Sequence, residues 1–317
     1  LALGGFFWVL DRGSTWPWVL TIYALFWIFY APTWSLLATV CFAHLPDKES
    51  DFPKVRAMGT LGWMMAGLAV SLLLKSDQSC LSGYVATLIL IVAAALAWHL
   101  PETPPRGTGP RGWRRSMGLQ AFTLLRDRDQ RVFFLTTLFM GIPLAAFYPY
   151  TPRLLEWLGT TEVTAWMSLG QITELIGLFT LVGLMKRWRI KWLISLALLA
   201  ALLRYGFYLV GAESGIALWV VLGLSLHGIA YTFHMVTGQV FLERRVGEGM
   251  RGQAQALLSC MAGMGSILGA CVVGQWFLFA VERRAIPLWT PFWGGLFVIV
   301  GAILIYFWRG YGGRDSS

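Results

Sequence analysis

The sequence predicts an all-α protein that crosses a membrane many times, and three observations lead to that prediction. Of the 317 residues, 57% are hydrophobic and only 13% are charged, and the mean hydropathy is +0.63. Apolar stretches of about 20 residues, long enough for a helix to cross a hydrocarbon core, recur along the chain with short polar breaks between them. Lys and Arg are concentrated in every second break, which is typical of membrane proteins with basic cytoplasmic loops.

Nine complete spans are predicted, after one partial span. The partial span, 1–10, is too short to cross a bilayer, has no initiating Met and lacks the features of a signal peptide, so we expect the chain to begin inside a helix. The complete spans are expected at 17–43, 54–74, 82–100, 132–155, 164–185, 192–211, 216–241, 252–280 and 288–308.

The longest polar break, 101–131, divides the spans into two unequal groups. It opens with Pro and Gly turns and continues as a basic, partly amphipathic stretch. A transporter made of two six-helix halves would lack about two and a half helices here, so we expect an N-terminally truncated chain. In that interpretation, 1–100 is the remainder of an N-terminal bundle, 101–131 is a cytoplasmic loop, and 132–317 is a C-terminal six-helix bundle with a short cytoplasmic tail.

The distribution of Lys and Arg predicts the orientation. One set of alternate breaks holds 19 of the 25 basic residues, the opposite set holds 5, and Arg204 lies within a span. Because basic loops stay in the cytoplasm, we expect a cytoplasmic C-terminus. The net charge of +9 is then explained by basic loops that face anionic lipid of the surrounding bilayer.

Several functional classes lack support in the sequence. The four cysteines have no CxxC spacing, so neither a metal site nor a disulfide framework is expected. There is no Walker loop, no G-x-G-x-x-G and no G-x-S-x-G motif, so we expect neither an enzyme nor a cofactor. No basic stripe with interleaved aromatic residues indicates a nucleic-acid partner.

Glu174 is the most informative residue, because it is the only acid near the middle of a long apolar stretch, 164–185. An ionised carboxylate at mid-membrane costs about 2.5–3.5 kcal/mol on insertion scales, so such residues usually mark a cavity or a partner. The Glu174 carboxyl can gain and lose a proton as its surroundings change. Gln171 lies on the same helical face. The alternative is that Glu174 forms a permanent structural bridge with an internal cation such as Arg204.

A second polar face precedes it in the chain. Arg56, Thr60 and Trp63 are spaced at i, i+4 and i+7, so they share one side of a helix. A guanidinium, a hydroxyl and a large ring on one face suit a polar ligand with an aromatic part. Alternatively, Arg56 anchors a helix end at the headgroups and Trp63 is a packing residue.

A third face carries His227, Tyr231 and His234 at the same spacing. Imidazoles titrate near neutral pH and could relay a proton or bind a polar ligand. The alternative is that both histidines are packing residues.

Two further patterns concern helix geometry. Gly265 and Gly269, four residues apart, predict a close helix crossing. The cluster of Pro and aromatic residues at 147–152 is expected either to break its helix or to kink it.

These residues give the chain a resemblance to the bacterial nucleoside:proton symporter family of the major facilitator superfamily. The similarity covers essentially the whole chain, and its most specific parts are the DFP-x-x-R-x-x-G-T-x-G string and the Q-x-x-E pattern that ends at Glu174. The matching segments are YAPTWSLLAT (30–39), DFPKVRAMGTLGW (51–63), SLGQITE (168–174), LHGIAYTFHMVTGQVF (226–241) and MRGQAQALL (250–258).

The resemblance implies a twelve-helix, two-bundle fold that imports nucleosides with protons by alternating access, as a monomer in the bacterial inner membrane. It also implies that the faces of Arg56 and Glu174 line the central cavity. The substrate-binding residues are then expected to be Arg56, Thr60, Trp63, Tyr148, Gln171, Glu174, His227 and Tyr231, with Glu174 and His234 in proton coupling.

The chain departs from the family pattern at four positions. It has Thr232 where members can carry Asp, Ala145 and Tyr148 where they carry Gln and Asn, and Ala38 in place of a typical Asn. These departures leave Glu174 as the principal coupling candidate, while Trp63, Tyr148 and Tyr231 can still stack against a base.

Two other functions remain open from the sequence. The first is a carrier for a sugar or another small polar solute. The second is a non-transporting membrane sensor or scaffold, for which the long basic loop with seven Arg is the support.

Overall fold

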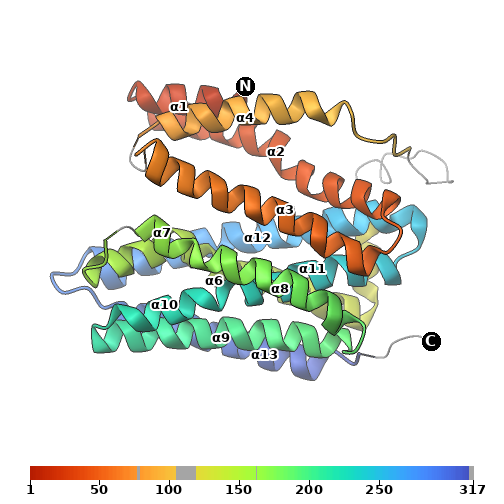
Figure 1. The fold of residues 1–317 in the computed structure, drawn as a ribbon. Coiled ribbons are helices and arrows are strands. Elements are labelled where there is room, and N and C mark those ends of the chain that lie inside the picture. The colour runs from red at the N-terminus through yellow and green to blue at the C-terminus, as the bar shows by residue number, and fades with distance from the viewer. Residues whose placement is uncertain (77–78, 105–118, 162, 314–317) are drawn as a thin grey trace.

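A computed structural model describes residues 1–317 except 77–78, 105–118, 162 and 314–317, and every regular element in the described part is a helix (Figure 1). Part of the predicted cytoplasmic loop, 101–131, therefore lies outside the described residues. The first group of elements comprises α1 (Ala2–Asp11), α2 (Trp16–His44), α3 (Lys48–Leu68), η1 (Ala69–Leu73) and α4 (Leu81–Ala97).

The second group follows the break in the description. It comprises η2 (Leu119–Arg126), α6 (Arg128–Trp157), α7 (Val163–Met167), α8 (Leu169–Met185), α9 (Ile190–Ser214), α10 (Ala217–Ser225), α11 (His227–Arg245), η3 (Glu248–Met250), α12 (Arg251–Phe277), η4 (Leu278–Glu282) and α13 (Trp289–Gly310).

Each of the nine predicted spans falls on one of these helices or on a pair of them. In the described part of the chain, seven continuous helical stretches are long and apolar enough to cross a membrane. The two others are α3, which opens with charged residues, and α4, which has 17 residues. The protein is thus a multi-pass, all-α membrane protein, as its apolar stretches predicted.

Local sequence explains where several helices start and stop. The carboxylate of Asp127 caps α6 by accepting a hydrogen bond of 2.9 Å from the backbone N–H of Gln130. Gly215 ends α9 with a φ of 71°, a conformation that favours glycine. The Pro and aromatic cluster at 147–152 does not interrupt α6, which continues from Arg128 to Trp157.

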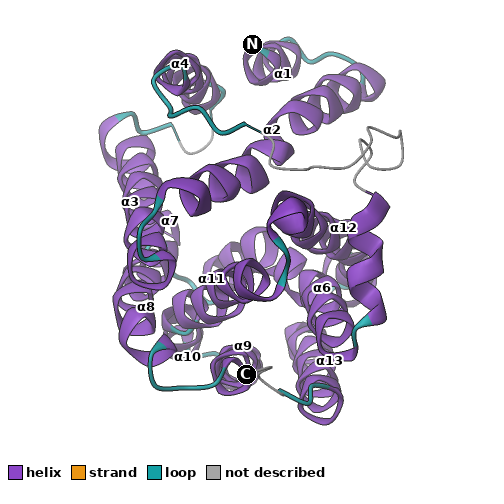
Figure 2. Ribbon diagram, turned by 90° about the vertical axis from the view of Figure 1, so that its right-hand side faces the viewer, coloured by secondary structure: helices purple, strands orange, loops and turns teal. Residues whose placement is uncertain are grey.

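The helices run roughly side by side, so the loops gather at two ends of the molecule. Figure 1 shows α2, α8, α11 and α13 all finishing at the same end, on the right of the view. We call this the basic end, because the chain segments there carry most of the Lys and Arg. Figure 2 shows α1, α2 and α4 on one side of the molecule and α9 and α13 on the other.

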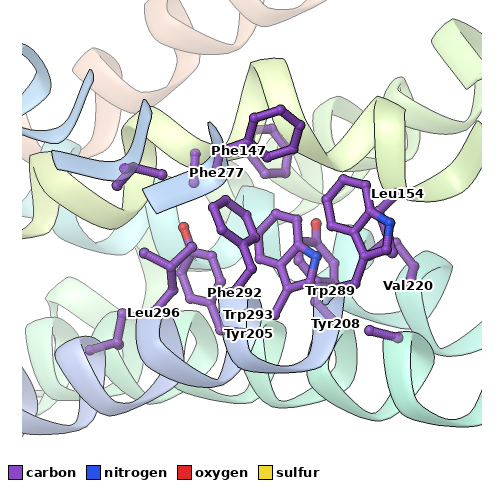
Figure 3. Close-up of a cluster of buried hydrophobic side chains, with 14 of the residues drawn as sticks. Phe147, Leu154, Tyr205, Tyr208, Val220, Phe277, Trp289, Phe292, Trp293 and Leu296 are labelled. Carbon is purple, nitrogen blue, oxygen red and sulfur yellow. The ribbon is translucent and has the colours of Figure 1, made fainter. Parts of the chain in front are cut away.

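Most of the buried core lies among the helices from α6 onward. One cluster stacks Tyr205, Tyr208 and Trp293 with Phe147 and Phe292, and all of these side chains are fully buried (Figure 3). Because lipid is as apolar as the bundle interior, such rings hold membrane helices together by close van der Waals packing and edge-to-face contacts.

A different cluster joins the two groups of helices. Phe42 of α2 and Phe52 of α3 have ring centroids 4.2 Å apart. They pack with Leu181 of α8 and with Val236 and Val240 of α11. This cluster, which we call the bridging cluster, lies towards the basic end and holds α2 and α3 against the C-terminal helices.

Small residues set the crossing of α6 and α12, as the spacing of Gly265 and Gly269 predicted. A Cβ atom on Gly265 would lie 1.9 Å from the carbonyl oxygen of Leu138, and one on Gly269 would lie 2.7 Å from the Cβ of Ala145. Only glycine permits backbones to approach this closely.

Replacing Gly265 with Leu should therefore force α6 and α12 apart. Overpacking at such a site typically destabilises a protein by about 1–3 kcal/mol, and the apparent Tm of the purified protein in detergent should fall. Gly263→Leu is the matched control, because a Cβ atom at Gly263 meets nothing within 4 Å. Equal Tm values for the two variants would contradict the assignment of this crossing.

Candidate functional site

Glu174 of α8 lies against α3, with its Oε1 atom 2.9 Å from the hydroxyl oxygen of Thr60. Both side chains are buried, with exposed fractions of 9% and 7%. The Thr60 hydroxyl is also 3.3 Å from the carbonyl oxygen of Arg56, one turn earlier in α3. An ionised Glu174 can accept the Thr60 hydrogen, whereas a protonated Glu174 can donate to Thr60, which then donates to the Arg56 carbonyl. This arrangement keeps a hydrogen bond in either protonation state.

A close crossing of α8 and α11 fixes the backbone at Glu174. A Cβ atom on Gly228 of α11 would lie 1.9 Å from the backbone nitrogen of Glu174, so a larger residue would push the two helices apart. One turn away, a Cβ atom on Gly170 would lie 3.3 Å from the ring of His227. Glycines on both helices thus bring the acid and the third polar face together.

Two helix junctions lie beside this crossing. Ser168 separates α7 from α8, and Leu226 separates α10 from α11. Both residues keep right-handed helical backbone angles, so each pair of helices forms one continuous span. Gln171, 7% exposed, comes shortly after the first junction, and His227 follows the second directly.

Arg56 presents a positive charge to the same region. Its side chain is half-buried, and its guanidinium carbon lies 5.5 Å from the ring centroid of Trp34. The guanidinium is close enough to Glu174 and to the Tyr231 hydroxyl to act on both electrostatically. This placement favours an inward-facing role for Arg56 over an anchor that extends to the headgroups.

Two predicted site residues keep large open ring surfaces. Trp63 is 58% exposed and Tyr148 is 51% exposed. The Tyr148 ring lies edge-on to Phe147 and His227, with centroid distances of 4.9 and 6.0 Å. No ring contact among the described residues involves Trp63. The structure therefore packs Tyr148 with the rings of Phe147 and His227, and it leaves the Trp63 ring outside this group.

His227 is bound by Arg204 and not by Glu174. Arg204 is 2% exposed, and it donates to Nδ1 of His227 at 2.6 Å and to the hydroxyl of Tyr205 at 3.0 Å. Because a guanidinium only donates, Nδ1 of His227 is unprotonated and the ring proton is on Nε2. The imidazole also stacks on Phe147, with a centroid distance of 3.8 Å and an interplanar angle of 2°. In the described contacts, Arg204 therefore supports a neutral His227 in place of the alternative bridge to Glu174.

His234 lies against α6, away from the crossing of α8 and α11. Its Nε2 atom is 3.0 Å from the hydroxyl of Thr137, which also donates to the carbonyl oxygen of Phe133. When the Thr137 hydrogen goes to Phe133, His234 donates to the Thr137 oxygen, and the His234 ring packs near the ring of Phe133. None of the described contacts joins His234 to Glu174.

The positions where the chain departs from the family pattern have different surroundings. Thr232 is fully buried, and its hydroxyl lies 3.5 Å from the carbonyl oxygen of Glu174, so this position borders the site. Ala145 faces Gly269 at the crossing of α6 and α12. An alanine there belongs to helix packing.

The sequence interpretation missed two buried acids, Asp129 of α6 and Glu243 of α11. Glu243 near the end of α11 is 4% exposed, and its Oε1 atom lies 2.6 Å from Lys48 of α3 and 3.2 Å from Arg251 of α12. The bridging cluster and this ion cluster both join the two groups of helices at the basic end. Glu243 directly precedes Arg244 and Arg245 in a polar break, where an acid is common, so the sequence does not mark it as buried.

Known proteins that are similar to this chain are membrane transporters. The family model for the nucleoside H+ symporter matches residues 5–310. The putative nucleoside transporter YegT of Escherichia coli K12 is 35% identical over 289 residues, which cover 87% of this chain and 67% of that protein. The xanthosine permease of the same organism is 26% identical over 311 residues, covering 92% and 73%.

The fold also matches a solved transporter. A crystal structure of a mutant of the nucleoside transporter NupG aligns with a TM-score of 0.78 and 23% identity, over 98% of this chain and 81% of that chain. This similarity shows a major facilitator fold. The chain therefore belongs to the nucleoside H+ symporter family and is a membrane transporter, not an enzyme.

Proposed function

We propose that this protein carries nucleosides together with protons by alternating access, and that Glu174 is the proton-coupling residue. The observation that carries the proposal is the hydrogen bond between Glu174 of α8 and Thr60 of α3. It joins the two groups of helices that must move relative to one another in an alternating-access cycle. Relatives named as nucleoside transporters support the substrate class.

In the proposed cycle, the protonation state of Glu174 decides how the helices are held. Protonation removes a charge from a buried site and reverses the direction of the hydrogen bond to Thr60. The nearby guanidinium of Arg56 then lacks an anionic neighbour and can interact with a polar substrate. Separation of α3 from α8 would expose the carboxyl to water on one side of the membrane, where it can exchange its proton.

A nucleoside fits the residues that surround this acid. It offers ribose hydroxyls to Arg56, Gln171 and Glu174, and a flat base to the rings of Tyr148 and Tyr231. The Nε2–H group of His227, whose tautomer Arg204 fixes, supplies a further donor in this cluster. Trp63 has an open ring face on the same side of α3 as Arg56 and Thr60.

We place the protein in the bacterial inner membrane with the basic end, including the C-terminus, in the cytoplasm, where it works as a monomer. Basic loops of short length prefer that side. The bridging cluster and the ion cluster at Glu243 hold the two groups of helices together at this end, which supports a state closed towards the cytoplasm.

The energy of one proton is sufficient for uphill transport. A proton that moves down 100 mV releases about 2.3 kcal/mol. At about 1.4 kcal/mol for each tenfold change in ratio, this supports roughly forty- to fiftyfold accumulation.

Glu174→Gln in the intact protein should keep exchange of labelled uridine across vesicle membranes but abolish uphill uptake, because an amide cannot carry the proton. With a proton gradient equivalent to about 100 mV, the expected ratio of inside to outside uridine is about one for Glu174→Gln. It is roughly forty for the unaltered protein. Glu156→Gln, an exposed acid at the end of α6, is the control. Undiminished accumulation in Glu174→Gln would disprove the coupling role, and inhibition by sugars but not nucleosides would favour a sugar carrier.

Thr60→Val should lower the rate of proton-driven uptake, because it removes the hydroxyl that meets Glu174 while keeping a similar shape. Loss of a hydrogen bond to a charged group costs about 1.5–3 kcal/mol, which corresponds to about a ten- to hundredfold effect. Thr60→Ser should restore most of the rate. Thr180→Val is the control, since Thr180 is an exposed residue of the same helix as Glu174. A Thr60→Val protein with normal uptake would contradict the role of this contact.

Glu243→Gln should weaken closure at the basic end. Lys48 bridges to Glu243 from the other group of helices, so the closed state should lose about 1 kcal/mol and the open state should gain about fivefold in population. Half-buried Cys41 of α2 reports on that end, and its thiol should react correspondingly faster in a protein whose other cysteines are replaced.

The control for this experiment is Asp51→Asn. It breaks the ion pair with Lys54, which lies within α3 and does not join the two groups of helices. Equal reactivity of Cys41 in the two variants would mean that Glu243 does not help to close this end.

A further inference from the structure

A groove lies on the outer surface between α9 and α13, near the basic end. It encloses a cavity of about 510 Å³, and its lining includes Trp192, Ser195, Leu199, Leu304 and Arg309. Both views of the fold place α9 and α13 on the side opposite α1, α2 and α4 (Figures 1 and 2). The groove is therefore separate from the candidate site at Glu174, and it opens on the surface that faces the bilayer.

The polarity of the groove changes along its length. At the basic end, the rings of Trp192 and Trp308 meet edge to face with centroids 5.2 Å apart, and Lys191 lies 5.1 Å from the centre of the Trp308 ring. Trp and basic residues are typical of the level of the lipid headgroups. Further in, the walls become aliphatic, with Leu199 of α9 and Leu304 of α13.

A hydroxyl group lies between these two zones. Ser195 is 8% exposed and lines the groove, and its Oγ atom has no hydrogen-bond partner among the described residues. A buried polar atom of this kind normally has a partner. Ser195 is one turn beyond Lys191 in α9, about 6 Å deeper at a rise of about 1.5 Å per residue.

The charges at the mouth are positive. Segment 186–191 carries Lys186, Arg187, Arg189 and Lys191 and contains no acid, and Arg309 adds an exposed guanidinium from α13. The nearby carboxylate of Asp129 already accepts the backbone N–H groups of Gly312 and Gly313, at 2.8 and 3.0 Å. Among the described residues, an anionic group at the mouth would therefore meet cations and no other carboxylate.

We propose that this groove binds an anionic phospholipid. The lipid phosphate would lie beside Arg309 at the basic end. A glycerol ester oxygen would accept a hydrogen bond from the Ser195 hydroxyl, and an acyl chain would lie along Leu199 and Leu304 towards the middle of the membrane. The order of cation, hydroxyl and aliphatic wall matches the order of groups in a phospholipid. A soluble anion would leave the aliphatic part of the groove uncovered.

The test is retention of lipid by the purified intact protein. The protein is mixed with equal amounts of phosphatidylglycerol and phosphatidylcholine of the same chain length, and bound lipids are counted by native mass spectrometry. We expect preferential binding of phosphatidylglycerol. Arg309→Gln should reduce that preference by about fivefold, the effect of about 1 kcal/mol per basic residue near an anionic surface.

A second variant and a control separate charge from shape. Leu199→Trp fills the aliphatic part of the groove and should reduce retention of both lipids, while Leu199 is exposed enough for the protein to keep its Tm. Arg283→Gln, at the end of the molecule opposite to Arg309, should change nothing. Equal retention of the two lipids by the unaltered protein, or full preference in Arg309→Gln, would overturn the proposal.

Discussion

The contact of Glu174 with Thr60 is the interaction on which the rest of the structure depends. A carboxyl group at membrane depth needs a polar partner in each protonation state, and a hydroxyl that can both donate and accept meets that need. The Arg56 carbonyl completes the arrangement, because it takes the Thr60 hydrogen when Glu174 is protonated. Thr60 belongs to α3 and Glu174 to α8. A change in the protonation state of Glu174 therefore also changes the contact between the two groups of helices.

The surrounding helices keep this contact in place. Gly228 lets α11 lie directly on the backbone of Glu174, and Gly265 does the same for α12 on α6. A core of stacked aromatic rings makes the C-terminal helices one packed unit. Fewer contacts join the two groups of helices: the hydrogen bond of Thr60 with Glu174, and, towards the basic end, the bridging cluster and the ions around Glu243. Such a distribution suits a structure in which one end opens while the bundle itself stays intact.

The apolar stretches predicted the spans well, because the length of a membrane helix is set by the bilayer and every such stretch must be helical. The same reasoning singled out Glu174, since a lone acid in an apolar span stands out in the sequence. Helical spacing placed His227 and His234 on one face, and both do face α6. Spacing could not tell which helix that face meets, so the pairing of His227 with Arg204 was not foreseen. Glu243 was missed for a related reason, because its burial arises only when α3 and α12 pack beside it.

Proton exchange on substrate binding is the most direct measurement of the central claim. Titration calorimetry of the intact protein with a nucleoside, in buffers that differ in ionisation enthalpy, gives the number of protons taken up or released for each nucleoside bound. We predict a clear proton exchange for the unaltered protein, and none for Glu174→Gln at the same pH. The same number of protons in both proteins would show that another group carries the proton and would contradict the coupling role of Glu174.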